Sequence, residues 1–109
     1  MITVTTAAAA QIRTAAKQGH AEGLALRIAA KRAADGRIEY GMGFDDTGRE
    51  DDLQFDSEGV QLVVAPMSLE LLSGTVIDYV ELNPGEFQFI FMNPNDPDYV
   101  PPEGDSTPH

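Results

Sequence analysis

The sequence has 109 residues, no cysteine, two histidines and a formal net charge of −11. A chain of this length typically forms one domain, and a hydrophobic content of 42% is enough to build its core. Because cysteine is missing, the chain cannot form disulfides, thiolate-bound zinc sites or cysteine-ligated iron–sulfur clusters, and it cannot use thiolate catalysis.

The charge is divided unevenly along the chain. Residues 1–43 contain six of the seven basic residues and three of the eighteen acidic residues, and no lysine or arginine follows Arg49. An acidic surface repels nucleic-acid phosphates and anionic lipid, and it suits a protein partner with a basic surface. We therefore expect no nucleic-acid partner and no membrane partner. The alternative is that the acidic residues only keep the protein in solution.

The N-terminal half predicts a strand, a helix and a β-hairpin. Residues 2–4 alternate as a short strand does, and Thr5 or Thr6 can cap a helix that begins with four alanines and ends at Gly19. The hydrophobic period then changes to two in residues 24–31 and 38–44. Between these two strands, Asp35-Gly36 is a hairpin signal.

The C-terminal half predicts four more strands and a second helix. Strands are expected at residues 53–55, 61–65, 76–82 and 86–92, with a polar loop at 45–52 and a short helix opened by Pro66 at 67–72. The pattern indicates a mainly β, α+β fold with two short helices, a sandwich or open barrel, in a single domain over residues 1–95. Residues 96–109 form an acidic, proline-rich tail that we expect to be disordered.

No targeting or membrane segment is visible in the sequence. The N-terminus lacks a basic segment followed by an apolar one, and every apolar run is shorter than the roughly 20 residues of a membrane-spanning helix. We therefore expect a cytoplasmic protein.

One acidic cluster lies in the predicted polar loop and consists of Asp45, Asp46, Glu50, Asp51 and Asp52. Its carboxylates are ligands that Ca²⁺ and Mg²⁺ prefer, but their spacing is not that of an EF-hand. Acidic runs are usually exposed to solvent. The cluster is therefore interpreted as a solvated or partner-facing patch, and no metal site is predicted.

No set of residues predicts an enzyme. His20 and Ser68 are far apart in the sequence, and neither lies in a nucleophile elbow. Gly41-Met42-Gly43 lies inside a predicted strand, so it does not match a nucleotide-binding loop. The aromatic residues at strand spacing are expected in the core: Tyr40, Phe44, Phe55, Phe87, Phe89 and Phe91. We therefore predict no catalytic residue and no cofactor.

The segments, taken in order, resemble the HesB/IscA/SufA family of A-type carriers in iron–sulfur cluster assembly. The stretches ITVTTAAAAQI, GLALRIAAK and IEYGMGFDD are similar to the opening helix and the first long strands of that family. GVQLVVAPMSLELLSGTVIDYVE and FQFIFMNPN resemble its longest motif and its closing strand. The resemblance covers about residues 2–95 and implies a HesB-like domain.

The resemblance also implies where this chain departs from the family. Members carry three cysteines that bind iron or a cluster, and the corresponding positions here lie near Asp35, Val100 and Pro102. The chain is similar to the cysteine-free DsrR subgroup of sulfur-oxidation gene clusters, in the stretches YGMGFDD, VIDYVELNPGEF and FIFMNPNDPDY. This implies an accessory or regulatory protein of sulfur metabolism that acts through protein contacts. Without thiolates to bridge subunits, we expect a monomer.

An alternative keeps a role in iron handling or cluster assembly. Asp35, together with an acidic residue of the tail such as Asp98, could bind iron through carboxylate oxygens. Oxygen ligands hold soft metals and clusters less selectively than thiolates do.

Overall fold

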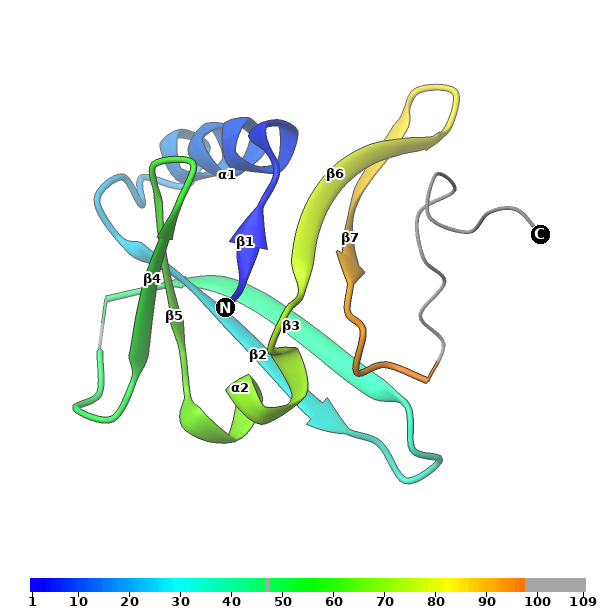
Figure 1. The fold of residues 1–109 in the computed structure, drawn as a ribbon. Helices are drawn as coiled ribbons and strands as arrows, with labels where there is room; N and C mark the ends of the chain where they lie inside the picture. The colour runs from blue at the N-terminus through cyan, green and yellow to red at the C-terminus, as the bar shows by residue number, and fades with distance from the viewer. Residues whose placement is uncertain (47, 98–109) are drawn as a thin grey trace.

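The computed structural model describes residues 1–46 and 48–97. The elements follow in the order β1 (Thr3–Val4), α1 (Thr6–Gln18), β2 (Ala25–Arg32), β3 (Ile38–Asp45), β4 (Leu53–Ser57), β5 (Val60–Val64), α2 (Pro66–Leu72), β6 (Val76–Asn83) and β7 (Glu86–Met92) (Figure 1). The expected mainly β fold with two helices is confirmed.

The strands form two sheets. One has three strands in the order β1-β6-β7, and the other has four in the order β3-β2-β5-β4. β1 pairs with β6 and β2 pairs with β5 in parallel, whereas β2–β3, β4–β5 and β6–β7 are antiparallel. Each sheet has two edge strands, so the described residues form no closed barrel. None of the described helices is long and apolar enough to cross a membrane.

The N-terminal segment joins the two sheets to α1. Thr5 accepts the Ala8 N–H at its Oγ1 at 3.1 Å, so it is the N-cap of α1. The same hydroxyl donates to Asp78 Oδ1 of β6 at 2.6 Å. The backbone N–H of Val4 donates to Ser57 Oγ at 3.0 Å. These bonds fix the start of the helix against both sheets.

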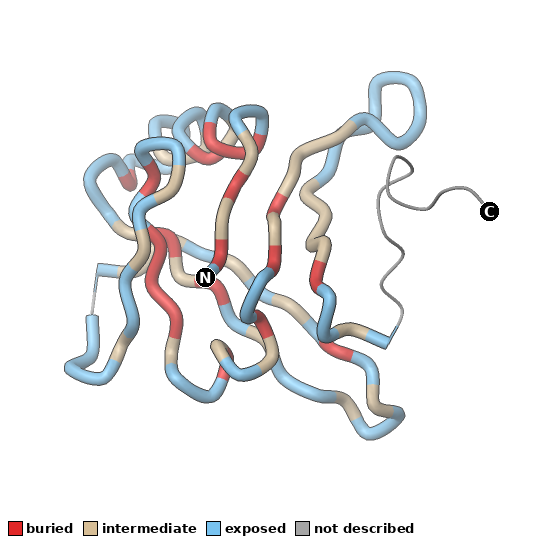
Figure 2. Tube along the Cα trace, in the orientation of Figure 1, coloured by how far each residue is buried: buried red, intermediate tan, exposed pale blue. Residues whose placement is uncertain are grey.

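The core lies between α1 and the inner faces of the two sheets. Along β2 and β3 the alternating residues form pairs, with Leu26 opposite Phe44 and Ile28 opposite Met42. The fully buried side chains include Ile2, Ile28, Leu62, Leu72 and Ile77. Figure 2 shows buried segments in β1, α1 and β5, while the far end of the β6–β7 hairpin is exposed.

The aromatic residues do not all lie in the core. Tyr40, Phe44, Phe55, Phe89 and Phe91 are partly buried and pack against it, as expected. Phe87 is 53% exposed, so the prediction is wrong for this residue. The physical reason is that the far end of the β6–β7 hairpin extends beyond the core (Figure 1), where Phe87 stacks on Tyr79 of the neighbouring strand.

Candidate functional site

Asp35, which the resemblance places at the first family cysteine position, lies on the turn between β2 and β3. Asp35 is exposed there, and its Oδ1 accepts the backbone N–H of Arg37 at 3.0 Å. Arg32 Nη1 donates to the Gly36 carbonyl at 2.7 Å, and Gly36 takes a positive φ of 89°. The Asp35 carboxylate therefore stabilises its own turn, as aspartate commonly does.

The chain leaves β7 through a turn that we call the Asn-Pro-Asn clasp, formed by Asn93, Pro94 and Asn95. Asn93 is fully buried, and its Nδ2 donates to the Leu71 carbonyl at 2.7 Å. Asn95 Nδ2 donates to the Ser73 carbonyl at 2.8 Å, and its backbone N–H donates to Asn93 Oδ1 at 2.9 Å. The clasp thus uses carbonyl groups at the C-terminal end of α2 that the helix itself leaves unpaired.

Gly74 makes room for this clasp. Its φ is 85°, and a Cβ at this position would come within 3.3 Å of the Pro94 ring. Glycine adopts this conformation without steric cost, so Gly74 lets the chain after α2 pass close to Pro94.

Tyr40 connects the clasp to β3. Its ring stacks on Phe91 with centroids 4.4 Å apart, and its hydroxyl accepts a hydrogen bond from Asn93 Nδ2 at 3.2 Å. The same hydroxyl donates to Asp96 Oδ2 at 2.7 Å. The described chain therefore ends beside β3, the strand that follows the Asp35 turn. Val100, Pro102 and Asp98 lie outside the described residues, as does the tail expected to be disordered, residues 96–109, from residue 98 onward.

The acidic loop is organised by an arginine on the outer face of β2. Arg27 donates from Nη1 to Asp52 Oδ1 at 3.0 Å and from Nη2 to Asp52 Oδ2 at 2.6 Å. Its Nε donates to Asp45 Oδ2. The Asp52 side chain is only 1% exposed, and its Oδ2 also accepts the Arg49 backbone N–H at 2.8 Å. We call Arg27, Asp45 and Asp52 the arginine network.

The arginine network divides the five acidic residues expected to face a partner. The hydrogen bonds from Arg27, followed by that from the Arg49 backbone, hold the pKa of Asp52 below its ordinary value. The hydrogen bonds that Arg27 donates to Asp52 and Asp45 raise the pKa of Arg27. Asp45 and Asp52 are thus structural partners of Arg27. The exposed carboxylates are those of Asp46, Glu50 and Asp51.

The described residues do not bring together a metal site or a catalytic set. Within residues 1–46 and 48–97, no group of three histidine, aspartate or glutamate side chains could hold a metal ion. The buried Ser68 hydroxyl is held by β2, because Oγ accepts the Ala30 N–H at 3.2 Å and donates to the Ala30 carbonyl at 3.3 Å. His20 is exposed just after α1 with a φ of 54°.

Sequence reasoning missed the pairing of Arg27. The alternation of β2 puts this residue on the outer face opposite Gly43, which offers no side chain to cover it. An isolated arginine on the exposed face of a strand, near an acidic loop, is a signal for such an ion pair, but the sequence alone does not say which carboxylates it selects.

The comparison with known families decides the identity of the fold. A family model for iron–sulphur cluster biosynthesis matches residues 1–99. The chain belongs to this family. Within it, the chain is 42% identical over 90 residues to the iron–sulfur cluster insertion protein ErpA of Xanthomonas campestris pv. campestris strain B100, covering 82% of this chain and 69% of ErpA. It is 37% identical over 91 residues to ErpA of Xylella fastidiosa strain M12, and the match covers 84% of this chain and 70% of that ErpA.

Solved structures agree with this family membership. A crystal structure of IscA with the [2Fe-2S] cluster superposes with a TM-score of 0.73 at 29% sequence identity, and 86% of each chain is covered. The Escherichia coli SufA structure gives a TM-score of 0.69 at 27% identity, again covering 86% of each chain.

This member of the iron–sulphur cluster biosynthesis family lacks the thiolate donors that usually hold a cluster. Its 109 residues contain no cysteine, so no thiolate is available to hold the cargo. The side chain at the turn between β2 and β3 is a carboxylate that already accepts a backbone N–H. The residues present therefore do not fit an iron–sulfur cluster, although the family fold is kept.

Proposed function

We propose that this protein is an A-type carrier homologue that holds no cluster and acts through contacts with another protein. One observation carries the proposal, namely that the family fold is kept in a chain of 109 residues without a single cysteine. The buried Asn-Pro-Asn clasp supports it, because Asn93 still makes its hydrogen bonds to α2. A fold that keeps its packing but has no thiolates can still offer a binding surface to another protein.

The proposed contact surface is the acidic loop, with Asp46, Glu50 and Asp51 as its charged side chains. All three are exposed. The arginine network holds Asp45 and Asp52, so the neighbouring Asp46 and Asp51 are anchored next to the sheet. Preorganisation of this kind lowers the ordering cost of binding.

The β6–β7 hairpin exposes apolar area at the opposite end of the molecule from the acidic loop, so it is a separate surface (Figure 1). Leu82 and Phe87 are each 53% exposed, and Tyr79 packs against Phe87 with ring centroids 5.6 Å apart. Aromatic residues are enriched where proteins meet, because they provide contact area at low entropic cost. The partner that fits the acidic loop is a protein with a basic patch.

The cellular role that we propose is accessory or regulatory, in sulfur oxidation. It rests on the resemblance of the stretches YGMGFDD and FIFMNPNDPDY to the DsrR subgroup. A strain that lacks this protein is expected to lose sulfur-oxidation rate while its iron–sulfur enzymes keep their activity. Loss of the iron–sulfur enzymes with normal sulfur oxidation would contradict the role.

The contact itself is tested by capture of partners from native lysate on the immobilised protein. The triple variant Asp46→Lys, Glu50→Lys, Asp51→Lys is expected to lose the captured partner, and added salt is expected to weaken the capture by wild type. The matched control reverses three exposed acids on other elements: Asp56, Glu70 and Glu86. If both triple variants lose the partner equally, the acidic loop is not the contact.

Residual iron binding has less support. Asp35 Oδ1 already accepts the Arg37 N–H, and an oxygen-only site is weak and unselective for soft metals and clusters. Calorimetric titration with ferrous iron separates the two functions. Micromolar binding that disappears in Asp35→Ala would favour iron handling over the contact function, and the absence of heat is the result that we expect.

A further inference from the structure

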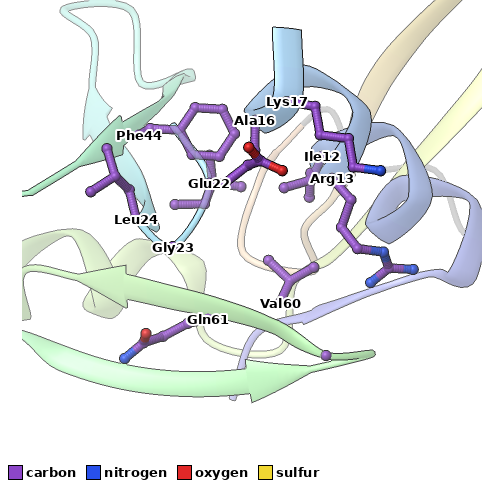
Figure 3. Close-up of a pocket in the computed structure, with 12 residues that line it drawn as sticks. Ile12, Arg13, Ala16, Lys17, Glu22, Gly23, Leu24, Phe44, Val60 and Gln61 are labelled. Carbon is purple, nitrogen blue, oxygen red and sulfur yellow. The ribbon is translucent and has the colours of Figure 1, made fainter. Parts of the chain in front are cut away.

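A cavity of about 370 Å³ lies between α1 and the strands β2, β3 and β5 (Figure 3). Its apolar lining includes Ile12, Leu26, Phe44 and Val60. Binding sites for small molecules typically measure about 300–1,000 Å³ and are mostly apolar with a few polar groups. The cavity therefore has the size of such a site, with a lining that combines apolar side chains with polar and charged ones. Neither the arginine network nor the Asn-Pro-Asn clasp contributes to it.

Two cations from α1 stand on one side of this cavity. Arg13 and Lys17 are four residues apart and so lie on the same face of the helix. Both residues are exposed at the rim of the cavity, and Figure 3 shows them on the side opposite the Phe44 ring, with their charged ends directed away from that ring. Among the described residues, neither cation forms an ion pair with a carboxylate. Their charge is therefore available to a ligand.

Arg13 is held in place by the chain itself. Its Nη1 donates to the Glu58 carbonyl at 2.9 Å. A guanidinium has five N–H donors, so this bond orients the group and leaves donors for an anion. Arginine also recognises carboxylates and phosphates by planar, two-point hydrogen bonding.

The cavity is positive in a protein that is negative as a whole. Its charged lining consists of Arg13, Lys17 and Glu22, so its formal charge is +1, whereas the chain carries −11. Glu22 forms no ion pair with either cation among the described residues. Its carboxylate points into the cavity, beside the Phe44 ring (Figure 3).

We propose that this cavity binds a small amphipathic organic anion, a carboxylate on a short apolar body. The carboxylate contacts Arg13 and Lys17, and the apolar part packs against Phe44, Leu26 and Val60. The volume is near the lower end of the range for small-molecule sites, which favours a short ligand. This site goes beyond the contact function and is independent of it.

Octanoate is the probe, and octanamide is its neutral counterpart. Each is titrated into the ¹⁵N-labelled protein, and amide shifts are followed by NMR. Octanoate is expected to shift residues around the cavity, such as Ala16 and Val60, and to bind at least about fivefold more tightly than octanamide, as a partly exposed charge contact allows. No shift at millimolar octanoate, or equal binding of both compounds, would overturn the proposal.

Single variants test the charges with opposite signs. Arg13→Gln and Lys17→Gln are each expected to weaken octanoate binding about three- to fivefold, and Glu22→Gln is expected to tighten it about twofold. Lys31→Gln removes the same charge from an exposed part of β2 outside the cavity and is expected to have no effect. An equal loss in Lys31→Gln, or weaker binding in Glu22→Gln, contradicts the assigned site.

Discussion

Arg27 holds Asp52 through two parallel hydrogen bonds, Nη1 to Oδ1 at 3.0 Å and Nη2 to Oδ2 at 2.6 Å. Paired bonds between a guanidinium and a carboxylate are stronger and more directional than single ones. The two residues are 25 positions apart, so their pairing closes the acidic loop on the outer face of the four-stranded sheet.

This pairing predicts how the stability of the protein depends on pH. The folded pKa of Asp52 is lower than its ordinary value of 3.8, so the charged carboxylate stabilises the folded state. The stabilisation of the folded state by the charged Asp52 is fully present above pH 3.8, and it is lost as the pH falls through the lower pKa of the folded protein. The melting temperature of Asp52→Asn is therefore expected to lie below that of wild type at neutral pH, with the difference shrinking below pH 3.8. Asp56→Asn, at an exposed position of β4, is the control. A difference independent of pH would contradict the pairing.

The Asn-Pro-Asn clasp predicts a large loss of stability in Asn93→Ala. The side chain is fully buried, donates to the Leu71 carbonyl and to Tyr40 and accepts the Asn95 N–H, so its truncation removes these hydrogen bonds and leaves a cavity. The expected cost is about 2–3 kcal/mol in the free energy of unfolding, measured in urea. Asn83→Ala, at an exposed position near the tip of the β6–β7 hairpin, is expected to change it by less than about 0.5 kcal/mol. Equal effects at the two positions would mean that the clasp does not stabilise the fold.

The buried hydroxyl of Thr75 predicts that one substitution at this position stabilises the protein. The residue is fully buried, and its Oγ1 has no hydrogen-bond partner among the described residues. Replacing the hydroxyl by a methyl in Thr75→Val removes a buried polar group, so the free energy of unfolding is expected to rise by about 1 kcal/mol. Thr75→Ser keeps the hydroxyl, loses the methyl and is expected to destabilise by about 1 kcal/mol. A destabilised Thr75→Val would show that the hydroxyl has a partner in solution.

The absence of thiolates predicts a monomer. No cysteine is available to bridge subunits through a shared cluster. Light scattering after size exclusion is expected to give a mass near 11.8 kDa across a range of protein concentrations. A stable dimer would contradict this, and the exposed Leu82 and Phe87 would then be the first positions to replace by serine.

Most of the fold could be predicted because hydrophobic period fixes which face of each element is buried. The alternation around Ile28 and Met42 located β2 and β3, and Asp35-Gly36 located the turn between them. Phe87 continues the same alternation and yet is exposed, because a local pattern does not show where a hairpin extends past the core.

Less of the candidate site could be predicted. The sequence marked the acidic loop, but the division between the paired Asp52 and the exposed Asp51 depends on where Arg27 reaches across the sheet. The cavity beside α1 has no sequence motif either. It arises from the packing of Arg13 and Phe44, which come from elements far apart in the chain.

The central claim, that this carrier fold holds no cluster, is tested most directly by anaerobic reconstitution with ferrous iron and sulfide, followed by desalting and assay of bound iron and acid-labile sulfide. We predict background levels of both and no visible absorption of a cluster, since the chain offers no thiolate. Stoichiometric iron and sulfide that remain with the protein, together with a cluster absorption spectrum, would contradict the claim.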